Sequence, residues 1–214
     1  MGDTGRVIVV SGPSGVGKGT VIKELQKLHD NSARSVSVTS RKPRIGEIEG
    51  VHYFFKSKSE FEEMIEDDQF IEWDVFVGNY YGTSRSYIER LLAEGKDALL
   101  DITYKGAFNI RENFPECILV FVLPPSFAEL KRRLVARGTE SADEIEKRML
   151  TAESEIEYIN RFDYYVINDD ARLAAERLRS FIVAEECRIN DNVGNITGKI
   201  IGNIHGKERG LYNT

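Results

Sequence analysis

Short apolar runs alternate along the chain with stretches in which apolar residues recur every three or four positions. The runs at 6–11, 97–102 and 118–123 are rich in Val, Ile and Leu and are typical of strands buried on both faces. Shorter runs at 35–38 and 164–167 predict two further strands. Buried strands that alternate with helices pair in parallel, so the pattern predicts an α/β fold with a doubly wound sheet.

Stretches with helical spacing follow most of these strands. After the first strand, Val21, Leu25 and Leu28 recur at the i, i+4, i+7 spacing of an amphipathic helix. Further helices are predicted at 59 to about 67, at 84–95, at 127–137, after Ser141, and at 171 to about 188. Ser126 and Ser141 stand where a side-chain hydroxyl can cap the helix that follows.

The stretch at about 39–83 differs in character from the rest. It combines a proline turn, the aromatic run at 53–55, a short acidic helix and a strand-like run at 70–77. Short strands with turn signals and one small helix predict a compact α+β insert carried on the main sheet.

These segments suggest one domain over 1–188. Its core would comprise about 1–38 and 84–188, and a helical lid would cover about 131–150. The Gly/Asn-rich tail at 189–214 nearly repeats its own sequence and has no core-forming pattern. We expect the tail to be disordered, and docking on a neighbouring subunit is the alternative.

Composition narrows the classes of partner. The chain has 214 residues, of which 41% are apolar and 30% charged, and its formal net charge is −6. Nucleic acids and anionic membranes need a broad basic face, so we expect neither as a partner, and a phosphate site must use local clusters such as 41–44 and 131–133. Cys117 and Cys187 fit no disulfide framework or metal-ligand spacing, and no stretch reaches membrane-spanning length, so we expect a cytoplasmic protein.

Residues 12–18 read Gly-Pro-Ser-Gly-Val-Gly-Lys and match the phosphate-loop (P-loop) pattern G-x-x-x-x-G-K between a strand and a helix. The glycines let backbone N–H groups point at phosphate oxygens, and Lys18 would bridge the β- and γ-phosphates of ATP. A glycine turn with a chance lysine is the alternative. The predicted ATP ligands here are Pro13, Ser14, Gly15, Val16, Gly17, Lys18, Gly19 and Thr20.

One position departs from this pattern. Gly19 stands where a magnesium-binding Ser or Thr is usual, and the hydroxyl follows at Thr20. The departure weakens a direct contact between Mg²⁺ and a hydroxyl more than it weakens phosphate binding. Thr20 can contact a phosphate or a metal-bound water.

Several motifs between about 6 and 187 resemble those of guanylate kinases. They are Ser35–Arg44, Gly46-Glu47, Gly50, Tyr53–Phe55, Phe70–Trp73, Gly78–Thr83, Leu123–Ser126, Arg137–Thr139 and Asn168–Asp170. The resemblance implies phosphoryl transfer from ATP to GMP or dGMP in purine nucleotide metabolism, with Mg²⁺ as cofactor. It also implies a P-loop fold with a GMP-binding insert. We expect a monomer or a homodimer.

The resemblance places the phosphate of GMP on Arg41, Arg44, Tyr53 and Tyr81. Arg grips a phosphate dianion with a planar, permanently charged fork, and the two arginines flank a proline turn. The tyrosines add hydroxyl donors without adding charge. An exposed basic turn and two core aromatics are the alternatives.

Glu72 matches the glutamate that reads guanine in this family. A carboxylate can accept hydrogen bonds from both N1–H and the 2-amino group of guanine, whereas adenine presents a lone pair at N1. Ser37 and Thr83 are the matching hydroxyls, and Ser37 could donate to O6. An exposed charge on a strand is the alternative for Glu72.

Asp101 ends a buried strand, where α/β folds place acidic groups beside the phosphate crevice. It resembles the family aspartate that helps to hold hydrated Mg²⁺ or the acceptor, so Thr20 and Asp101 are the metal candidates, through water. Thr103 and Lys105 stand where many family members carry a second acid and Gln. We expect activity to survive this change.

Arginines near the γ-phosphate should matter most, because phosphoryl transfer depends on positioning and charge neutralisation. The resemblance implies that Arg137 and Arg148 bridge the two nucleotides when the lid shuts. Arg133 shares a helix face with Arg137 and is a further ATP candidate. Asn168 is a candidate neighbour of adenine, with a turn-making role as the alternative. The predicted catalytic residues are Lys18, Arg41, Arg137 and Arg148.

Two other functions are compatible with parts of this pattern. One is a kinase for another monophosphate, against which Glu72, Ser37 and Thr83 count. The other is a catalytically weak guanylate-kinase-like module that binds phosphorylated protein. Such a module should have an eroded phosphate loop or lid, and this chain keeps Lys18, Arg137 and Arg148.

Overall fold

The computed structural model describes residues 5–76, 78–136, 138 and 141–188. The chain divides into two compact units, Met1–Arg179 and Ser180–Thr214. The described part of the second unit, 180–188, continues helix α7 (Ala171–Glu186). The predicted tail at 189–214 lies outside the described residues. No helix in the described part of the chain is both long and apolar enough to cross a membrane.

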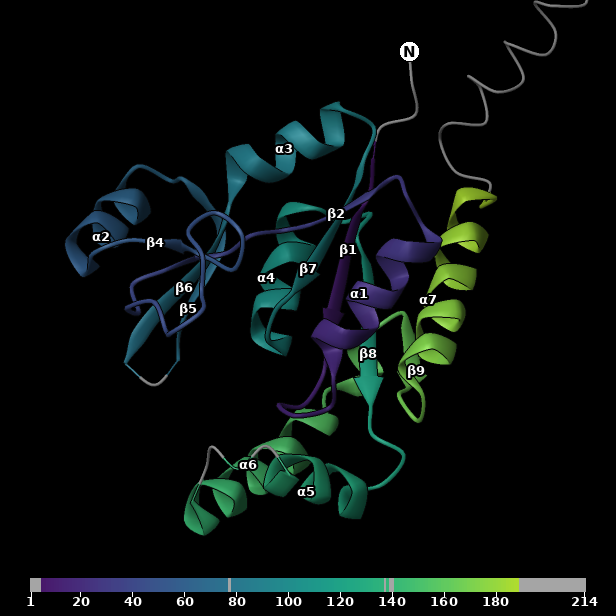
Figure 1. Ribbon diagram of the computed structural model, residues 1–214. Helices are drawn as coiled ribbons and strands as arrows, with labels where there is room; N and C mark the ends of the chain where they lie inside the picture. The colour runs from purple at the N-terminus through teal and green to yellow at the C-terminus, as the bar shows by residue number, and fades with distance from the viewer. Residues whose placement is uncertain (1–4, 77, 137, 139–140, 189–214) are drawn as a thin grey trace, which may run out of the picture. The chain divides into compact units, whose positions relative to one another are not determined.

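A central parallel sheet organises the first unit (Figure 1). Its strand order is β2-β7-β1-β8-β9, and all neighbouring strands run in parallel. The strands are β1 (Val7–Ser11), β2 (Ser32–Arg34), β7 (Asp97–Asp101), β8 (Ile118–Leu123) and β9 (Tyr164–Ile167). The parallel sheet predicted from the apolar runs is therefore confirmed.

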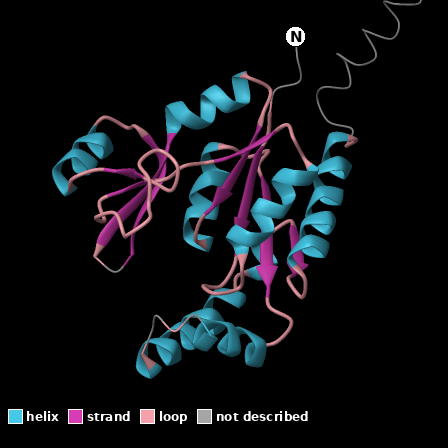
Figure 2. Cartoon of the chain, in the orientation of Figure 1, coloured by secondary structure: helices cyan, strands magenta, loops and turns pink. Residues whose placement is uncertain are grey.

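Helices cover the sheet because its strands are apolar on both faces (Figure 2). Val7 and Val9 of β1 form one buried cluster with residues of α3 and α4. Ile8 and Val10 point to the opposite face, since side chains alternate along a strand. The helices are α1 (Lys18–Leu28), α3 (Arg85–Ala93), α4 (Tyr104–Asn113), α5 (Phe127–Ala136) and α6 (Ala142–Ile156), with a short 3-10 helix at Ile159–Arg161.

A second sheet and one helix form the α+β insert that the pattern predicts. The sheet has the order β4-β3-β6-β5 and holds β3 (Val38–Thr39), β4 (Phe54–Phe55), β5 (Phe70–Phe76) and β6 (Asn79–Ser84). Helix α2 (Lys58–Glu66) places Phe61 against the sheet, where its ring stacks on Phe70 at 4.4 Å between centroids. The insert thus has a small aromatic core of its own.

The strand predicted at 35–38 is wrong. Strand β2 ends at Arg34, β3 begins at Val38, and 35–37 lead from one sheet to the other. The backbone N–H of Ser35 still donates to Leu99 of the central sheet, whereas the carbonyl of Ser37 already accepts from Phe54 of the insert. An alternating pattern cannot reveal that the chain changes its pairing partner between two residues.

Helix α4 was not predicted from the sequence pattern. Its signals are Thr103, whose hydroxyl caps the helix by accepting from the N–H of Gly106, and the buried side chains of Ala107 and Ile110. A glycine in the first turn weakens the helical pattern. The predicted caps at Ser126 and Ser141 are confirmed, because each hydroxyl accepts a backbone N–H from the helix that follows.

We expect Thr103→Ala to destabilise the protein by about 1 kcal/mol, because it removes the oxygen that caps α4. Thr103→Asp should retain most of the stability, because an aspartate caps a helix as well as a threonine does. Urea unfolding monitored by circular dichroism measures both variants. Equal unfolding free energies for Thr103→Ala and the unchanged protein would show that the cap does not stabilise α4.

Candidate nucleotide site

The phosphate loop joins β1 to α1 and is held in a tight curl by three glycines. Gly12, Gly15 and Gly17 have φ values of 136°, 90° and 97°, which disfavour residues with a Cβ. A Cβ on Gly12 would lie 2.3 Å from the carbonyl oxygen of Val122, and one on Gly15 would lie 2.6 Å from a methyl group of Leu134. The loop therefore fits closely against β8 and α5, and its glycines cannot be replaced without displacement.

Lys18 begins α1 and turns its side chain back over the loop. Its Nζ donates to the carbonyl oxygens of Gly12, at 2.6 Å, and Pro13, at 3.3 Å. Gly17 precedes it at the helix N-terminus, and Thr20 is exposed on the first turn. The predicted lysine thus lies at the mouth of the loop, where a phosphate would replace the two carbonyls as its partner.

Asn168 and Arg133 both donate hydrogen bonds to the backbone of the phosphate loop. The buried Asn168 donates from Nδ2 to the carbonyl of Val16 at 2.7 Å, and Arg133 donates to the same carbonyl at 3.2 Å and to that of Asn168 at 2.9 Å. Glu129 holds Arg133 at 2.8 Å. The amide of Asn168 is therefore used by the loop itself, and its proposed contact with adenine stays a prediction.

Helix α6 faces the loop with two charged side chains one heptad apart. Arg148 donates to the hydroxyl of Ser14 at 2.5 Å. Glu155 has a buried oxygen, Oε2, with no hydrogen-bond partner among the described residues. Burial raises the pKa of Glu155, and the charge of Lys18 opposes that shift. Glu155 was not predicted as a site residue, and Arg137 lies outside the described residues.

The turn at 41–44 of the insert, here called the arginine turn, holds the guanidinium of Arg41 in a fixed orientation. Arg41 forms a two-pronged ion pair with Glu47, at 3.0 and 2.8 Å, and lies over the ring of Tyr53 at 5.4 Å. Glu47 also accepts the backbone N–H of Arg44, whose side chain is exposed. The hydrogen bonds from Arg41 and then from Arg44 lower the pKa of Glu47 to about 2.

Tyr81 completes this group, because its ring meets that of Tyr53 edge to face at 5.9 Å. The structure thus brings together three of the four residues predicted for the acceptor phosphate, and Arg44 is the exposed fourth. Glu47 holds Arg41 but was not predicted as a site residue, although it belongs to the motif Gly46-Glu47. A carboxylate shortly after two arginines in the sequence, Arg41 and Arg44, was the available signal.

Glu72 is buried at 7% exposure in β5, so it is not an exposed strand charge. Thr83 of the paired strand β6 donates from its hydroxyl to Oε1 at 2.6 Å. Oε2 faces α4, where a Cβ on Gly106 would lie only 2.7 Å away. Burial raises the pKa of Glu72 to about 7, against the opposing hydrogen bond from Thr83. The predicted pair of Glu72 and Thr83 is therefore in contact, and Ser37 lies at the crossover before β3.

Asp101 lies at the carboxyl end of β7, beside the start of α1. A Cβ on Gly19 would lie 3.6 Å from its Oδ2, and the same oxygen accepts from Arg34 at 3.1 Å. Carboxylate oxygens suit a divalent cation or its water ligands, and the missing side chain at Gly19 leaves room beside this one. Arg34 was not predicted as a site residue. The exposed ion pair is worth about 0–1 kcal/mol.

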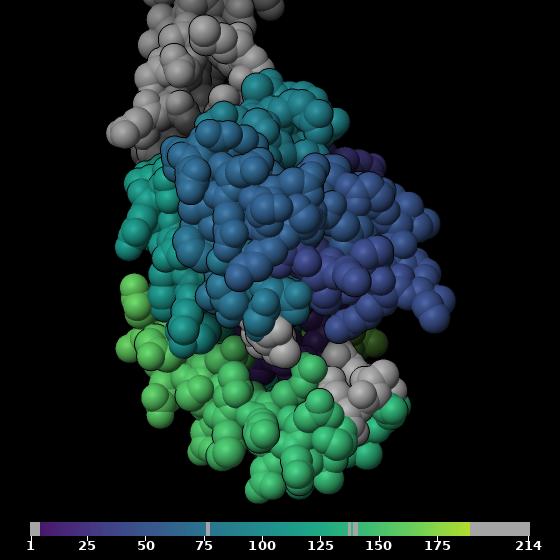
Figure 3. Space-filling view, turned by 90° about the vertical axis from the view of Figure 1, so that its left-hand side faces the viewer, coloured from purple at the N-terminus to yellow at the C-terminus, as the bar shows by residue number. Residues whose placement is uncertain are grey.

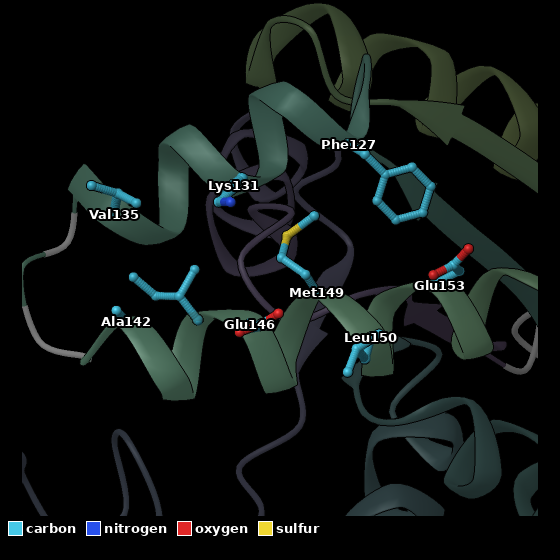
Figure 4. Close-up of a pocket in the computed structure, with 9 residues that line it drawn as sticks. Phe127, Lys131, Val135, Ala142, Glu146, Met149, Leu150 and Glu153 are labelled. Atoms are coloured by element: carbon cyan, nitrogen blue, oxygen red, sulfur yellow. The ribbon is translucent and has the colours of Figure 1, made fainter.

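The insert and the α5–α6 segment both appear on one face of the first unit (Figure 3). Figure 3 shows the insert in blue and the α5–α6 segment in green, with purple residues of the N-terminal segment visible between them. A separate groove of about 550 Å³ lies between α5 and α6 (Figure 4). It is lined mainly by apolar side chains such as Phe127, Val135, Met149 and Leu150. None of the predicted site residues that the structure describes lines this groove.

Comparison with known proteins agrees with this geometry. The model of the guanylate kinase family matches residues 4–185. A guanylate kinase of Bacillus cereus is 52% identical over 185 residues, which cover 86% of this chain and 90% of the relative. One of Bacillus subtilis is 47% identical over 189 residues, covering 88% and 93%. The crystal structure of guanylate kinase from Anaplasma phagocytophilum aligns with a TM-score of 0.72 at 32% identity, covering 87% and 88%.

The buried carboxylate predicts a pH-dependent gain in stability for Glu72→Gln. The pKa of about 7 in the folded protein exceeds the ordinary 4.5, so the folded state binds the proton more tightly, and stability is lost as pH rises between these values. The variant keeps an oxygen for Thr83 and avoids this loss, which is on the order of a few kcal/mol. Its melting temperature relative to the unchanged protein should therefore rise between pH 5 and pH 8.

The matched control is Glu63→Gln, an exposed position on α2, which should change the melting temperature equally at both pH values. If the difference for Glu72→Gln were also the same at pH 5 and pH 8, burial would not raise the pKa of Glu72.

Proposed function

The chain belongs to the guanylate kinase family, and on that premise we propose that it transfers the γ-phosphate of ATP directly to GMP or dGMP, giving ADP and GDP or dGDP. The observation that carries the proposal is the buried Glu72, held by Thr83 in an insert whose arginine turn suits a nucleotide phosphate. A substrate that donates two hydrogen bonds from its base edge would offset the cost of burying this carboxylate. Guanine does so.

ATP binds with its phosphates in the curl of the loop. The backbone N–H groups between Gly12 and Lys18 and the N-terminus of α1 favour negative charge there. Lys18 exchanges the carbonyls of Gly12 and Pro13 for the β- and γ-phosphates and follows the charge during transfer. The remaining ATP contacts in this proposal come from Pro13–Thr20, Arg133 and Asn168.

GMP binds in the insert with its phosphate toward the loop. Arg41, Arg44, Tyr53 and Tyr81 hold the phosphate, and Arg41 is presented in a fixed orientation because Glu47 grips its fork. The ionised Glu72 accepts from N1–H and the 2-amino group of guanine, and Ser37 donates to O6.

A divalent metal accompanies ATP in this family, and we propose Mg²⁺ here. Asp101, beside Gly19, and the exposed Thr20 would hold it through water, because hard oxygen ligands suit that ion. When bound, the ion neutralises charge on the phosphates and orients them. The chain itself supplies the remaining positive charge from Lys18, Arg41, Arg137 and Arg148.

Helices α5 and α6 act as the lid in this proposal. Arg148 already reaches Ser14 of the loop, so a small movement of α6 would bring its guanidinium to the transferring phosphate. Arg137, which lies outside the described residues, is the second arginine assigned to the transferring phosphate in this proposal. Closure excludes water and so suppresses hydrolysis of ATP without transfer. The proposed setting is purine nucleotide metabolism in the cytoplasm, with the protein as a monomer or homodimer.

Lys18→Ala should reduce GMP-dependent release of ADP by roughly 10²- to 10³-fold, because it removes the cation that follows the charge on the γ-phosphate. An enzyme-coupled ADP assay measures this. Lys23→Ala changes an exposed lysine on the same helix and should leave the rate unchanged. The absence of GMP-dependent ADP release by the unchanged protein would refute the proposed reaction.

Glu72→Gln should lower the preference for GMP over AMP by roughly 10- to 100-fold, since a bidentate base contact contributes about 1–3 kcal/mol of discrimination. The ratio of kcat/KM for the two nucleotides measures this preference. In the unchanged protein, KM for GMP should fall as pH rises from 6 to 8, because the ionised carboxylate reads guanine and its pKa is about 7. If the variant kept both the preference for GMP and the pH dependence of KM, Glu72 would not take part in base recognition.

A further inference from the structure

Arg34 is a cation at the site that the proposed reaction does not use. It is the last residue of β2, next to the crossover that carries the chain into the insert. Its side chain is 42% exposed, and Nη2 donates to Oδ2 of Asp101 at 3.1 Å. This oxygen is the one that lies beside Gly19 at the start of α1. Arg34 therefore reaches into the space between the phosphate loop and the insert.

Tyr53 links Arg34 to the residues proposed for the acceptor phosphate. Burial raises the pKa of the Tyr53 hydroxyl, as do the charges of Tyr81 and Asp101, whereas those of Arg41 and Arg34 lower it. Arg41 lies over the Tyr53 ring from the side of the insert. Two guanidinium groups, one from the end of β2 and one from the turn after β3, therefore act on the same tyrosine.

We propose that Arg34 is a third arginine of the acceptor site, which holds Asp101 in the empty enzyme and turns to the phosphate of GMP when the nucleotide binds. This inference rests on the proposed function, because it assigns a ligand to the same acceptor. It adds a residue from the central sheet to a phosphate site otherwise built by the insert.

The exchange of partners is favourable on electrostatic grounds. The pair of Arg34 and Asp101 is partly exposed and has a single hydrogen bond, so water screens it and little is lost when it opens. A nucleotide phosphate carries more charge than a carboxylate and accepts both prongs of a guanidinium. Arg41 differs, because Glu47 grips it with two hydrogen bonds. Arg34 is thus the more easily redirected of the two.

The exchange has a second consequence at the centre of the site. Asp101 loses its guanidinium partner only when the acceptor phosphate arrives. Its Oδ2, beside Gly19, then becomes available on the side of the loop where ATP binds. Binding of GMP would in this way release a carboxylate oxygen of Asp101 on the side of the loop where ATP binds.

The test compares GMP with guanosine, which has the same base and sugar but no phosphate. Isothermal titration in the absence of ATP and metal should show that Arg34→Gln weakens GMP binding about 5- to 10-fold and leaves guanosine binding unchanged. Arg34→Lys should weaken GMP binding less than Arg34→Gln does, because lysine keeps the positive charge but lacks the two-pronged guanidinium. In steady-state assays Arg34→Gln should raise KM for GMP by a similar factor and change kcat less than twofold.

Lys27→Gln is the matched control, since it removes one positive charge from the exposed face of α1, where Lys27 pairs with Glu24. It should bind GMP as the unchanged protein does. Equal GMP binding by Arg34→Gln and Lys27→Gln overturns the inference, and so does an equal loss of guanosine and GMP binding, which would indicate a structural role. If the unchanged protein bound GMP through Arg34 but did not phosphorylate it, the assignment of Arg34 would stand and the proposed reaction would fail.

Discussion

The close fit of the phosphate loop against the ends of the central strands is the constraint on which the site depends. Gly12 lies against the backbone of Val122 in β8, and Gly15 lies against Leu134 in α5. Asn168, after β9, holds the carbonyl of Val16. Three elements therefore meet at one loop, and the parallel order of the sheet brings them there. Because α5 also leads into the proposed lid, the loop is the fixed point from which the lid would move.

Glu72 shows how function limits stability in this molecule. A carboxylate at 7% exposure whose pKa is raised to about 7 disfavours the folded state at neutral pH. The surrounding structure keeps it there nonetheless, with Thr83 on one oxygen and Gly106 making room for the other. Gly106 belongs to α4 on the central sheet, so core and insert both contribute to the proposed guanine site. A binding site that must strip water from a charge carries this cost before its ligand arrives.

The sequence pattern predicts the parts of the fold that depend on local composition. Buried apolar runs predict four of the central strands, and the glycine spacing predicts the loop. The pattern fails at 35–37, because pairing partners are chosen by the tertiary structure, and at α4, whose first turn contains Gly106. Within the site, family motifs indicate the side chains that we propose to contact the substrates. Arg34 and Asp101 are 67 positions apart, so no local pattern announces that pair.

Several cations of the site that the structure describes have an internal partner when no substrate is bound. Arg41 holds Glu47, Arg34 holds Asp101 and Arg148 holds Ser14, while Lys18 rests on the loop carbonyls. A chain with a net charge of −6 can in this way keep a cluster of cations ordered without an external anion. In the proposed reaction each of these cations exchanges an internal partner for a phosphate, so the free energy of binding depends on how weakly the internal partner is held. In this proposal Arg41, held twice by Glu47, has a fixed orientation that suits positioning, whereas Arg34, held by one hydrogen bond to Asp101, and Arg148, which donates to Ser14, can move toward the phosphates.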